Sequence, residues 1–305
     1  MSESLSLRCD RGGVENPWPH RLAVITAGAT FLLILAGGLV TNTGAGLAVP
    51  DWPTTFGYNM FLYPWSKMVG GIFYEHSHRL IGSVVGLLTL TLTLVLWAVE
   101  PRRWLRWLGA TALFAVIIQG VVGGLRVILL QETLAIVHGA LAQAFFGLTV
   151  ALALFTSREW SEPPRAALDL PLKRLSLAVT GCLYLQIVFG SLLTHRGWLD
   201  AHLGGALLLL VIVPALVTRL SRLYPDQPKL TRPAVWLAGL LGFQLLLGAG
   251  AYLVRFTSVE LPLSTAFPVA HRLVGGLLLA ASLTLTLRAY RSWDAGLVRV
   301  SRVAA

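Results

Sequence analysis

Long apolar stretches, separated by short polar ones, dominate the chain. A helix needs about 20 predominantly apolar residues to cross the hydrocarbon layer of a bilayer. Eight stretches reach roughly this length, and they cover residues 22–42, 72–98, 105–126, 133–156, 174–194, 200–218, 233–254 and 266–288. The pattern predicts an all-α integral membrane protein with eight transmembrane helices.

The polar connections between these stretches are of two kinds. Three of them contain proline and several basic residues, around 100–106, 158–174 and 219–232, and we expect them to interrupt the helices. Together with both chain ends, this side holds 18 of the 24 Lys and Arg residues, and the other side holds six. Basic residues accumulate in cytoplasmic loops. Both termini are therefore expected in the cytoplasm.

Short motifs recur along the chain. A Q-x-x-x-G spacing occurs at Gln119, Gln186 and Gln244, and His78-Arg79-Leu80-Ile81-Gly82 matches His271-Arg272-Leu273-Val274-Gly275. The repeats predict a helical hairpin used four times, and hence two pseudo-symmetric four-helix bundles. The expected units are a cytoplasmic tail (1–21), an N-terminal bundle (22–156), a cytoplasmic linker (157–173), a C-terminal bundle (174–288) and a cytoplasmic tail (289–305).

Composition agrees with a membrane protein. Hydrophobic residues make up 55% of the chain and charged residues only 12%, against roughly 25% charged in soluble domains. A soluble globular enzyme and a disordered chain are thereby excluded. The net charge is +10, and the basic residues that produce it lie between the apolar stretches. We therefore interpret them as residues that set the orientation of the chain in a lipid bilayer. We expect no nucleic-acid partner. Cys9 and Cys182 lie in different environments, and we expect no disulfide.

Four histidines occur once in each even-numbered predicted helix, always near its start. They therefore share one depth, toward the outer side, and they are His78, His138, His202 and His271. A single histidine could simply bond a neighbouring helix, but ionisable residues in membrane spans are usually functional. Imidazole is the common axial ligand of haem, and helix bundles hold such cofactors in their cores. Four histidines predict two bis-histidine haem sites, with the pairing left open, His78 with His271 included.

Zinc fits these histidines less well. A structural zinc site takes a tetrahedral set of ligands that are close in sequence. Only Glu75, His76 and His78 are close in this chain. Gly82 and Gly275, one turn after their histidines, would let a flat macrocycle approach the helix backbone.

Glu75 distinguishes one predicted site from the other. It lies three residues before His78, so both side chains share a helix face. The corresponding positions before the other three histidines hold Ala135, Leu199 and Pro268. Only one site therefore has a carboxylate, and a carboxylate in such a position can exchange protons with a substrate.

Arg79 and Arg272 each follow a histidine directly. Arginine forms charge-assisted hydrogen bonds with carboxylates, so both are candidates to bind haem propionates. The alternative is an interfacial arginine whose head reaches the lipid headgroups. The residues alone leave these two interpretations open.

Taken in order, these motifs resemble the heme A synthase family over nearly the whole chain. The matching residues are Gly37-Gly38, Thr41, Thr43, Gly44, Gly46-Leu47, Asp51-Trp52-Pro53, Gly57, Glu75-His76-Ser77-His78-Arg79, His138, Ala142-Gln143, His202 and His271-Arg272. Two features depart from the family. The outer loops lack the cysteine pair of some members, and Asn42 stands where many members have arginine.

The resemblance implies an enzyme that oxidises the C8 methyl group of heme O to the formyl group of heme A, for terminal oxidase biogenesis. Two successive hydroxylations would give a geminal diol, which loses water. Heme O would lie between His78 and His138, and haem b between His202 and His271. Glu75 matches the catalytic carboxylate.

The resemblance also implies a bacterial cytoplasmic membrane, with the haem sites toward its outer face. The electron donor (a quinol or a ferredoxin-like protein), an association with heme O synthase and the oligomeric state stay open. The main alternative is a non-enzymatic di-haem electron-transfer cytochrome that oxidises quinol. A haem-free transporter would explain the repeats but not the four histidines.

Overall fold

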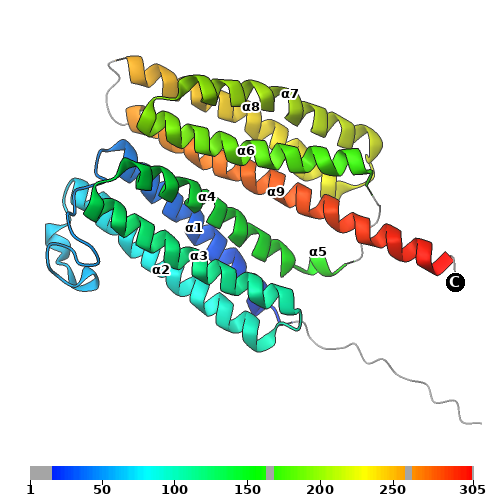
Figure 1. Ribbon diagram of the computed structural model, residues 1–305, viewed down its shortest axis with the longest axis horizontal. Coiled ribbons are helices and arrows are strands. Elements are labelled where there is room, and N and C mark those ends of the chain that lie inside the picture. The colour runs from blue at the N-terminus through cyan, green and yellow to red at the C-terminus, as the bar shows by residue number, and fades with distance from the viewer. Residues whose placement is uncertain (1–15, 163–167, 258–262, 304–305) are drawn as a thin grey trace, which may run out of the picture.

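The computed structural model describes residues 16–162, 168–257 and 263–303, and in them eight helices are long and apolar enough to cross a membrane (Figure 1). The first four are α1 (Trp18–Asn42), α2 (Gly71–Val99), α3 (Arg103–Leu129) and α4 (Glu132–Phe155). The others are α6 (Leu170–Arg196), α7 (Leu199–Leu223), α8 (Pro228–Phe256) and α9 (Leu263–Val303). One-turn elements are α5 (Arg158–Ser161), η1 (Met60–Leu62) and η2 (Trp65–Lys67). The predicted all-α membrane fold is confirmed.

The helices form two four-helix bundles that lie side by side (Figure 1). In each bundle, consecutive helices pack together and the fourth returns to the first. Each bundle has a core of its own. The N-terminal core includes Val85, Leu92, Leu105 and Leu152, and the C-terminal core includes Leu172, Val213, Leu237 and Leu285. The predicted pair of four-helix bundles is confirmed.

The two bundles meet where α1 and α4 pack against α6 and α9. Small residues allow this close approach. A Cβ atom on Gly276 of α9 would lie 2.9 Å from Oε1 of Gln143 in α4, and one on Gly147 would lie 3.4 Å from Cδ2 of Leu283. The Tyr184 hydroxyl of α6 also donates to the Ala140 carbonyl of α4 at 3.3 Å. The bundles therefore share a packed interface.

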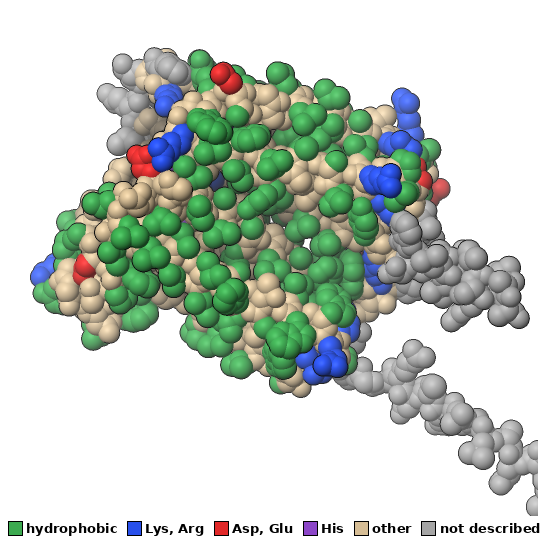
Figure 2. Space-filling view, viewed as in Figure 1, with side chains coloured by type: hydrophobic (Ala, Val, Ile, Leu, Met, Phe, Trp, Pro, Cys, Tyr) green, Lys and Arg blue, Asp and Glu red, His purple; other side chains and the backbone are tan. Residues whose placement is uncertain are grey.

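The flanks of the helices are apolar. Figure 2 shows hydrophobic side chains covering the visible flank, whereas Lys and Arg gather toward the two ends of the molecule. Large apolar side chains such as Leu207, Leu246 and Trp236 are about two-thirds exposed, at 65%, 70% and 67%. Such a surface is stable in contact with lipid and not with water. The multi-pass membrane protein expected from the sequence is thus what the fold presents.

Several helices extend beyond the apolar stretches. α1 begins at Trp18, α6 begins at Leu170 and α9 continues to Val303, so the predicted tails and linker are partly helical. Backbone hydrogen bonds do not depend on apolar side chains, and charged turns therefore continue the helix past the hydrocarbon layer. The N-terminal tail up to residue 15, Cys9 included, lies outside the described residues.

Prolines break the helices over fewer residues than the sequence predicts. α8 begins at Pro228, within the stretch predicted to break the helix. The first position of a helix suits proline because its N–H would have no intrahelical partner. Pro214, Pro233 and Pro268 lie inside helices, as membrane helices tolerate. The stretch 219–232 does interrupt the helix, as predicted, but the break covers only residues 224–227, between α7 and α8.

Candidate functional site

Two pairs of histidines face each other, one pair in each bundle. The ring centroids of His78 (α2) and His138 (α4) are 6.3 Å apart, with the planes at 80°. Those of His202 (α7) and His271 (α9) are 6.0 Å apart, at 68°. A metal–imidazole bond is about 2.0–2.1 Å long, so a metal ion with one imidazole on each side would separate the ring centroids by about 6 Å. The structure brings His78 to His138 and not to His271.

A glycine of the preceding helix lies against each of these four rings. A Cβ atom added to the glycine would contact Cε1 of the histidine at 2.9 Å (Gly123 and His138), 3.0 Å (Gly248 and His271), 3.1 Å (Gly37 and His78) or 3.3 Å (Gly190 and His202). Real Cβ contacts are rarely this short. Each ring therefore lies so close to the neighbouring helix backbone that a residue larger than glycine would force it to shift.

Sequence reasoning missed these contacts. The glycines singled out beforehand, Gly82 and Gly275, face Leu33 and Gln244 and not a histidine ring. The signal that was present is the Q-x-x-x-G repeat, since three of its glycines are the ones that contact histidines. From the sequence alone, this repeat indicates only a duplication.

The glutamines of the same repeat contact three of these histidines. Nε2 of Gln119 donates to the His138 carbonyl at 2.8 Å, and Nε2 of Gln186 donates to the His202 carbonyl at 2.8 Å. The Gln244 carbonyl lies 3.2 Å from Nδ1 of His271, and its amide lies 3.2 Å from Nε2 of the same ring. The first two bonds hold the histidine backbone, and Nε2 of Gln186 also lies 3.2 Å from Nδ1 of His202. The contact of His271 Nδ1 with a carbonyl is the kind that orients a metal-binding imidazole.

In the N-terminal bundle, one nitrogen of each imidazole lacks a protein partner. The Nδ1 atoms of His78 and His138 are buried and have no hydrogen-bond partner among the described residues. A buried polar atom of this kind is costly unless a partner completes the site. The opposed rings, their spacing and their unsatisfied nitrogens together fit a haem iron with two axial histidines.

Glu75 lies at the junction of α2 and the outer loop formed by residues 43–70. Its side chain is only 4% exposed. Oε2 accepts the backbone N–H of Val49 at 3.0 Å, and Oε1 accepts Nη2 of Arg79 at 3.0 Å. The two donors hold the carboxyl group in one orientation. The one carboxylate predicted near a histidine is thus buried and rigidly held.

Arg79 fastens the outer loop to α2. Nη1 donates to the carbonyls of Asp51 at 2.7 Å and Thr54 at 3.1 Å, and Nη2 donates to the Val49 carbonyl at 3.0 Å as well as to Glu75. Four of the five N–H groups of this guanidinium therefore have protein acceptors. The structure assigns Arg79 a role in holding the loop, and the predicted contact with a propionate has one N–H group left for it.

Two further residues order the outer loop. The Asp51 carboxylate accepts the N–H groups of Phe56 at 2.7 Å and Gly57 at 2.9 Å, and also the Thr54 hydroxyl. Partial burial raises the pKa of Asp51, but these hydrogen bonds outweigh it and hold the pKa below its usual range. His76, only 1% exposed, lies 3.1 Å from the Thr55 hydroxyl through Nδ1. His76 thus supports the loop.

Two arginines near the histidines make no hydrogen bond or ion pair with any described residue. Arg272 follows His271, and its Nη1 atom would lie 3.8 Å from a Cβ on Gly38. Arg126, near the end of α3, has its guanidinium against Gly46 of the outer loop, within electrostatic range of His78 and His138. Sequence reasoning left Arg126 without a role, because its proximity to both rings depends on the loop fold.

Two other polar residues have structural contacts. Asn42, which departs from the family pattern, donates from Nδ2 to the Gly38 carbonyl of its own helix at 2.8 Å. Nδ1 of His20 lies 3.0 Å from the Ala153 carbonyl and so links α1 to α4. Neither residue takes part in the histidine sites.

Comparison with known proteins gives consistent matches. A family model described as cytochrome oxidase assembly protein (COX15-CtaA) matches residues 20–197. A heme A synthase of Shouchella clausii is 33% identical over 140 residues, which cover 45% of this chain and 44% of that protein. Heme A synthases of Lysinibacillus sphaericus and Exiguobacterium sibiricum are 28% and 27% identical and cover 59% and 61% of both chains. The matched part therefore spans about half the length of these relatives.

Proposed function

The chain belongs to the COX15-CtaA family of cytochrome oxidase assembly proteins, and we propose that it is a heme A synthase. This enzyme is a haem-dependent membrane oxidoreductase that converts heme O to heme A. The observation that carries the proposal is the difference between the two histidine pairs: among the described residues, a buried carboxylate, that of Glu75, lies three residues before His78, and the same position before His202 and His271 holds Leu199 and Pro268. Relatives of the same name at modest identity support it.

The N-terminal bundle holds the substrate in this proposal. Heme O lies between His78 and His138, with its C8 methyl group toward Glu75. Two successive hydroxylations would convert that methyl group to a geminal diol, with O2 or an external electron acceptor taking up the four electrons lost by the carbon and O2 or water supplying the oxygen, and loss of water would leave the formyl group. The site's geometry supports this assignment, since the ring spacing of 6.3 Å suits an iron with two axial imidazoles.

The C-terminal bundle holds a haem b between His202 and His271. When bound, this cofactor supplies one-electron transfer to the substrate site. The protein's own part is to orient both ligands, through Gly190, Gln186 and Gln244. No carboxylate precedes His202 or His271 as Glu75 precedes His78, which agrees with electron transfer and not with oxygen insertion in this half.

Glu75 exchanges protons with the hydroxyl groups introduced on the substrate. Arg79 and the Val49 N–H hold the carboxylate in one orientation, as an acid–base group requires. The outer loop that Arg79 fastens covers this end of the bundle and limits access of water. A closed, polar environment of this kind strengthens electrostatic interactions with the reacting groups.

Free arginines bind the propionates. Arg272 serves haem b, and Arg126 serves heme O in place of Arg79, most of whose N–H groups are already bound to the loop. Propionates are carboxylates, and charge-assisted hydrogen bonds from arginine are the strong ones. This assignment gives each haem one guanidinium that makes no hydrogen bond or ion pair with the described residues.

The excess of Lys and Arg on one side supports cytoplasmic termini in a bacterial inner membrane, with both haem sites toward the outer face. A quinol or a ferredoxin-like protein is the electron donor, and heme O synthase is the candidate source of substrate. The alternative, a di-haem cytochrome that carries electrons across the bilayer, requires haems at two depths. All four histidines lie near the same end of their helices.

The test is analysis of the extracted haems. The protein is expressed in cells that make heme O, purified in detergent, and its pigments are separated by reversed-phase chromatography with mass detection. The proposal expects haem b together with heme A or hydroxylated heme O. A Glu75→Gln variant should keep haem b and lose at least about 100-fold in product, because general acid–base groups contribute about 10²–10⁴ in rate.

Glu132→Gln is the matched control. This carboxylate lies at the same end of the bundle, is 64% exposed and faces Arg196 at 4.0 Å, so product formation should be unchanged. Normal product from the Glu75 variant would refute the catalytic assignment. Haem b alone, at two per chain in the wild type, would favour the electron-transfer cytochrome.

A further inference from the structure

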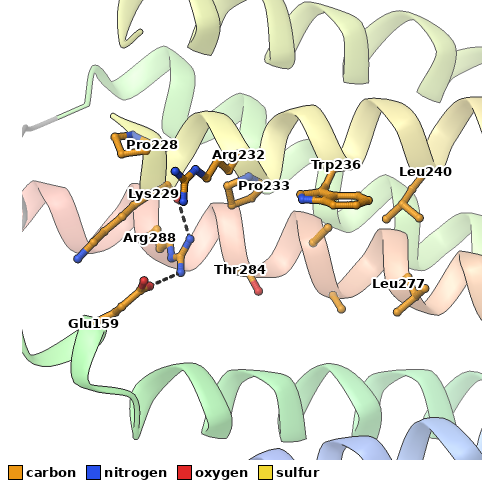
Figure 3. Close-up of a pocket in the computed structure, with 12 residues that line it drawn as sticks. Glu159, Pro228, Lys229, Arg232, Pro233, Trp236, Leu240, Leu277, Thr284 and Arg288 are labelled. Atoms are coloured by element: carbon orange, nitrogen blue, oxygen red, sulfur yellow. Dashed lines mark hydrogen bonds and ion pairs between the residues drawn. The ribbon is translucent and has the colours of Figure 1, made fainter. Parts of the chain in front are cut away.

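We propose that a groove between α8 and α9, at the end of the molecule that carries the basic connections, binds an anionic phospholipid. The groove has a volume of about 620 Å³ (Figure 3). It lies away from the histidine sites, and nothing in the proposed enzymatic reaction uses it. The inference therefore stands independently of the proposed function.

The shape of the groove suits an acyl chain. Pro233, Trp236 and Leu240 line it from α8, while Leu277 and Thr284 belong to the stripe that lines it from α9. These positions recur every three to four residues, so each set forms a continuous stripe along its helix. Seven residues of helix span about 10 Å. The α9 stripe also includes two small residues, Ala280 and Ala281, which leave room in the groove.

The charged end of the groove suits a phosphate group. Figure 3 shows Lys229, Arg232 and Arg288 at one end, and the apolar side chains toward the other. The lining carboxylate, Glu159, is already paired with Nη2 of Arg288 at 2.7 Å. Nζ of Lys229 likewise contacts Oε2 of Glu162 at 2.6 Å. Three basic side chains against two carboxylates, each of them paired with one of the three, leave one positive charge in excess at this end of the groove, that of Arg232.

Arg232 is the residue best placed to bind the phosphate. It makes no hydrogen bond or ion pair with any residue that the structure describes, and its side chain is exposed. The neighbouring Arg288 is instead held in place by the Lys229 carbonyl at 2.8 Å. One fixed guanidinium beside a free one is an arrangement that can receive an anion without reorganising the site.

The surroundings fit the headgroup region of a bilayer. Trp236 is 67% exposed, and tryptophan is enriched where membrane meets water. A second cavity of about 740 Å³ shares Arg288 and Glu159 and adds Arg21 and Arg158. Basic pockets between transmembrane helices are a known mode of binding anionic lipid headgroups. A neutral amphiphile such as a quinol would gain nothing from this cluster.

Native mass spectrometry of the full-length protein in detergent tests the proposal. Phosphatidylglycerol and phosphatidylcholine with the same acyl chains are titrated separately. Wild type should retain phosphatidylglycerol more strongly. Arg232→Gln should weaken its binding by about fivefold, the factor that one basic side chain at a membrane surface contributes, and Arg232→Lys should largely restore it. Ala280→Leu, which takes up room in the groove, should weaken it without any change in charge.

Arg222→Gln is the matched control, since this exposed arginine lies at the same end of the molecule and outside the groove. Thermal unfolding of each variant checks that it is folded. Equal binding of the two lipids, or an equal loss in the Arg222 variant, would overturn the proposal. So would displacement of the lipid by millimolar inorganic phosphate, or normal lipid binding by Ala280→Leu.

Discussion

The N-terminal bundle and the C-terminal bundle are built on one plan and differ at one end. Both have four helices, with a histidine on the second and fourth and a glycine behind each ring. The first connection differs. Residues 43–70 form a folded outer loop in the N-terminal bundle, whereas Gly197 and Trp198 alone join α6 to α7. The shared features are those that orient histidines, and the features found in one bundle only are those expected of an enzyme site.

The two His-Arg motifs show how the same residues acquire different contacts. Arg79 donates to Glu75 and to three loop carbonyls, whereas Arg272 has no hydrogen-bond or ion-pair partner in the described part of the chain. Pro268 occupies the position that matches Glu75, and no folded loop like 43–70 precedes α7. The His-Arg motif occurs in both bundles, but the residues around each arginine determine which contacts it makes.

Removing one histidine from each bundle should give the largest effect. His78→Ala should lose heme O and its products but keep haem b, and His202→Ala should lose haem b. The reason is that each iron loses one of its two axial ligands. Haem per chain, measured by pyridine haemochrome spectra and by mass detection of the extract, distinguishes the two. If His78 shared an iron with His271, His78→Ala would release haem b, and the comparison between the bundles would fail.

The second prediction contrasts the two arginines. Arg79→Gln should destabilise the N-terminal bundle by about 3–5 kcal/mol, because it leaves the buried Glu75 without its ion pair. Arg272→Gln should not destabilise the protein, since the substitution breaks no described hydrogen bond or ion pair and removes a charge that burial disfavours. Thermal and denaturant unfolding in detergent, together with hydrogen exchange of residues 43–70, measures both. Equal destabilisation by the two substitutions would show that the difference in contacts has no energetic consequence.

Much of this difference could not have been predicted from the sequence. All eight helices and the four histidines follow from hydrophobic length and helix position, which are local properties. Helix ends were predicted less well. Charged residues show where the chain leaves the membrane, but the backbone hydrogen bonds of a helix can continue beyond that point. The roles of Arg79 and Arg126 depend on how residues 43–70 fold back onto α2 and α3. Such long-range contacts leave no periodic pattern in the chain.

Arg126 provides a third test, now within the N-terminal bundle. Arg126→Gln should weaken retention of heme O by about 10–100-fold, because a hydrogen bond to a charged group contributes about 1.5–3 kcal/mol. Haem b should be unaffected. Arg103→Gln, at the opposite end of the same helix, is the control for loss of positive charge. The measurement is the ratio of heme O to haem b after washing in detergent, and an equal loss of both haems would contradict a role specific to the substrate site.

The smallest effects are expected from alanine substitutions of the glycines that contact the histidine rings. Gly123→Ala would bring a methyl group to 2.9 Å from His138, and Gly190→Ala would bring one to only 3.3 Å from His202. The first substitution overpacks its site, at a cost of about 1–3 kcal/mol, and the second requires the ring to move by a few tenths of an ångström. Gly120→Ala is the control, since nothing lies within 4 Å of its added Cβ. Its helix should even gain about 1 kcal/mol from the better propensity of alanine.

Haem retention and unfolding temperature should therefore fall in the order Gly120, Gly190, Gly123. The reverse order for the last two would mean that the two bundles hold their rings by different contacts, and that the shared plan does not extend to the ligands themselves.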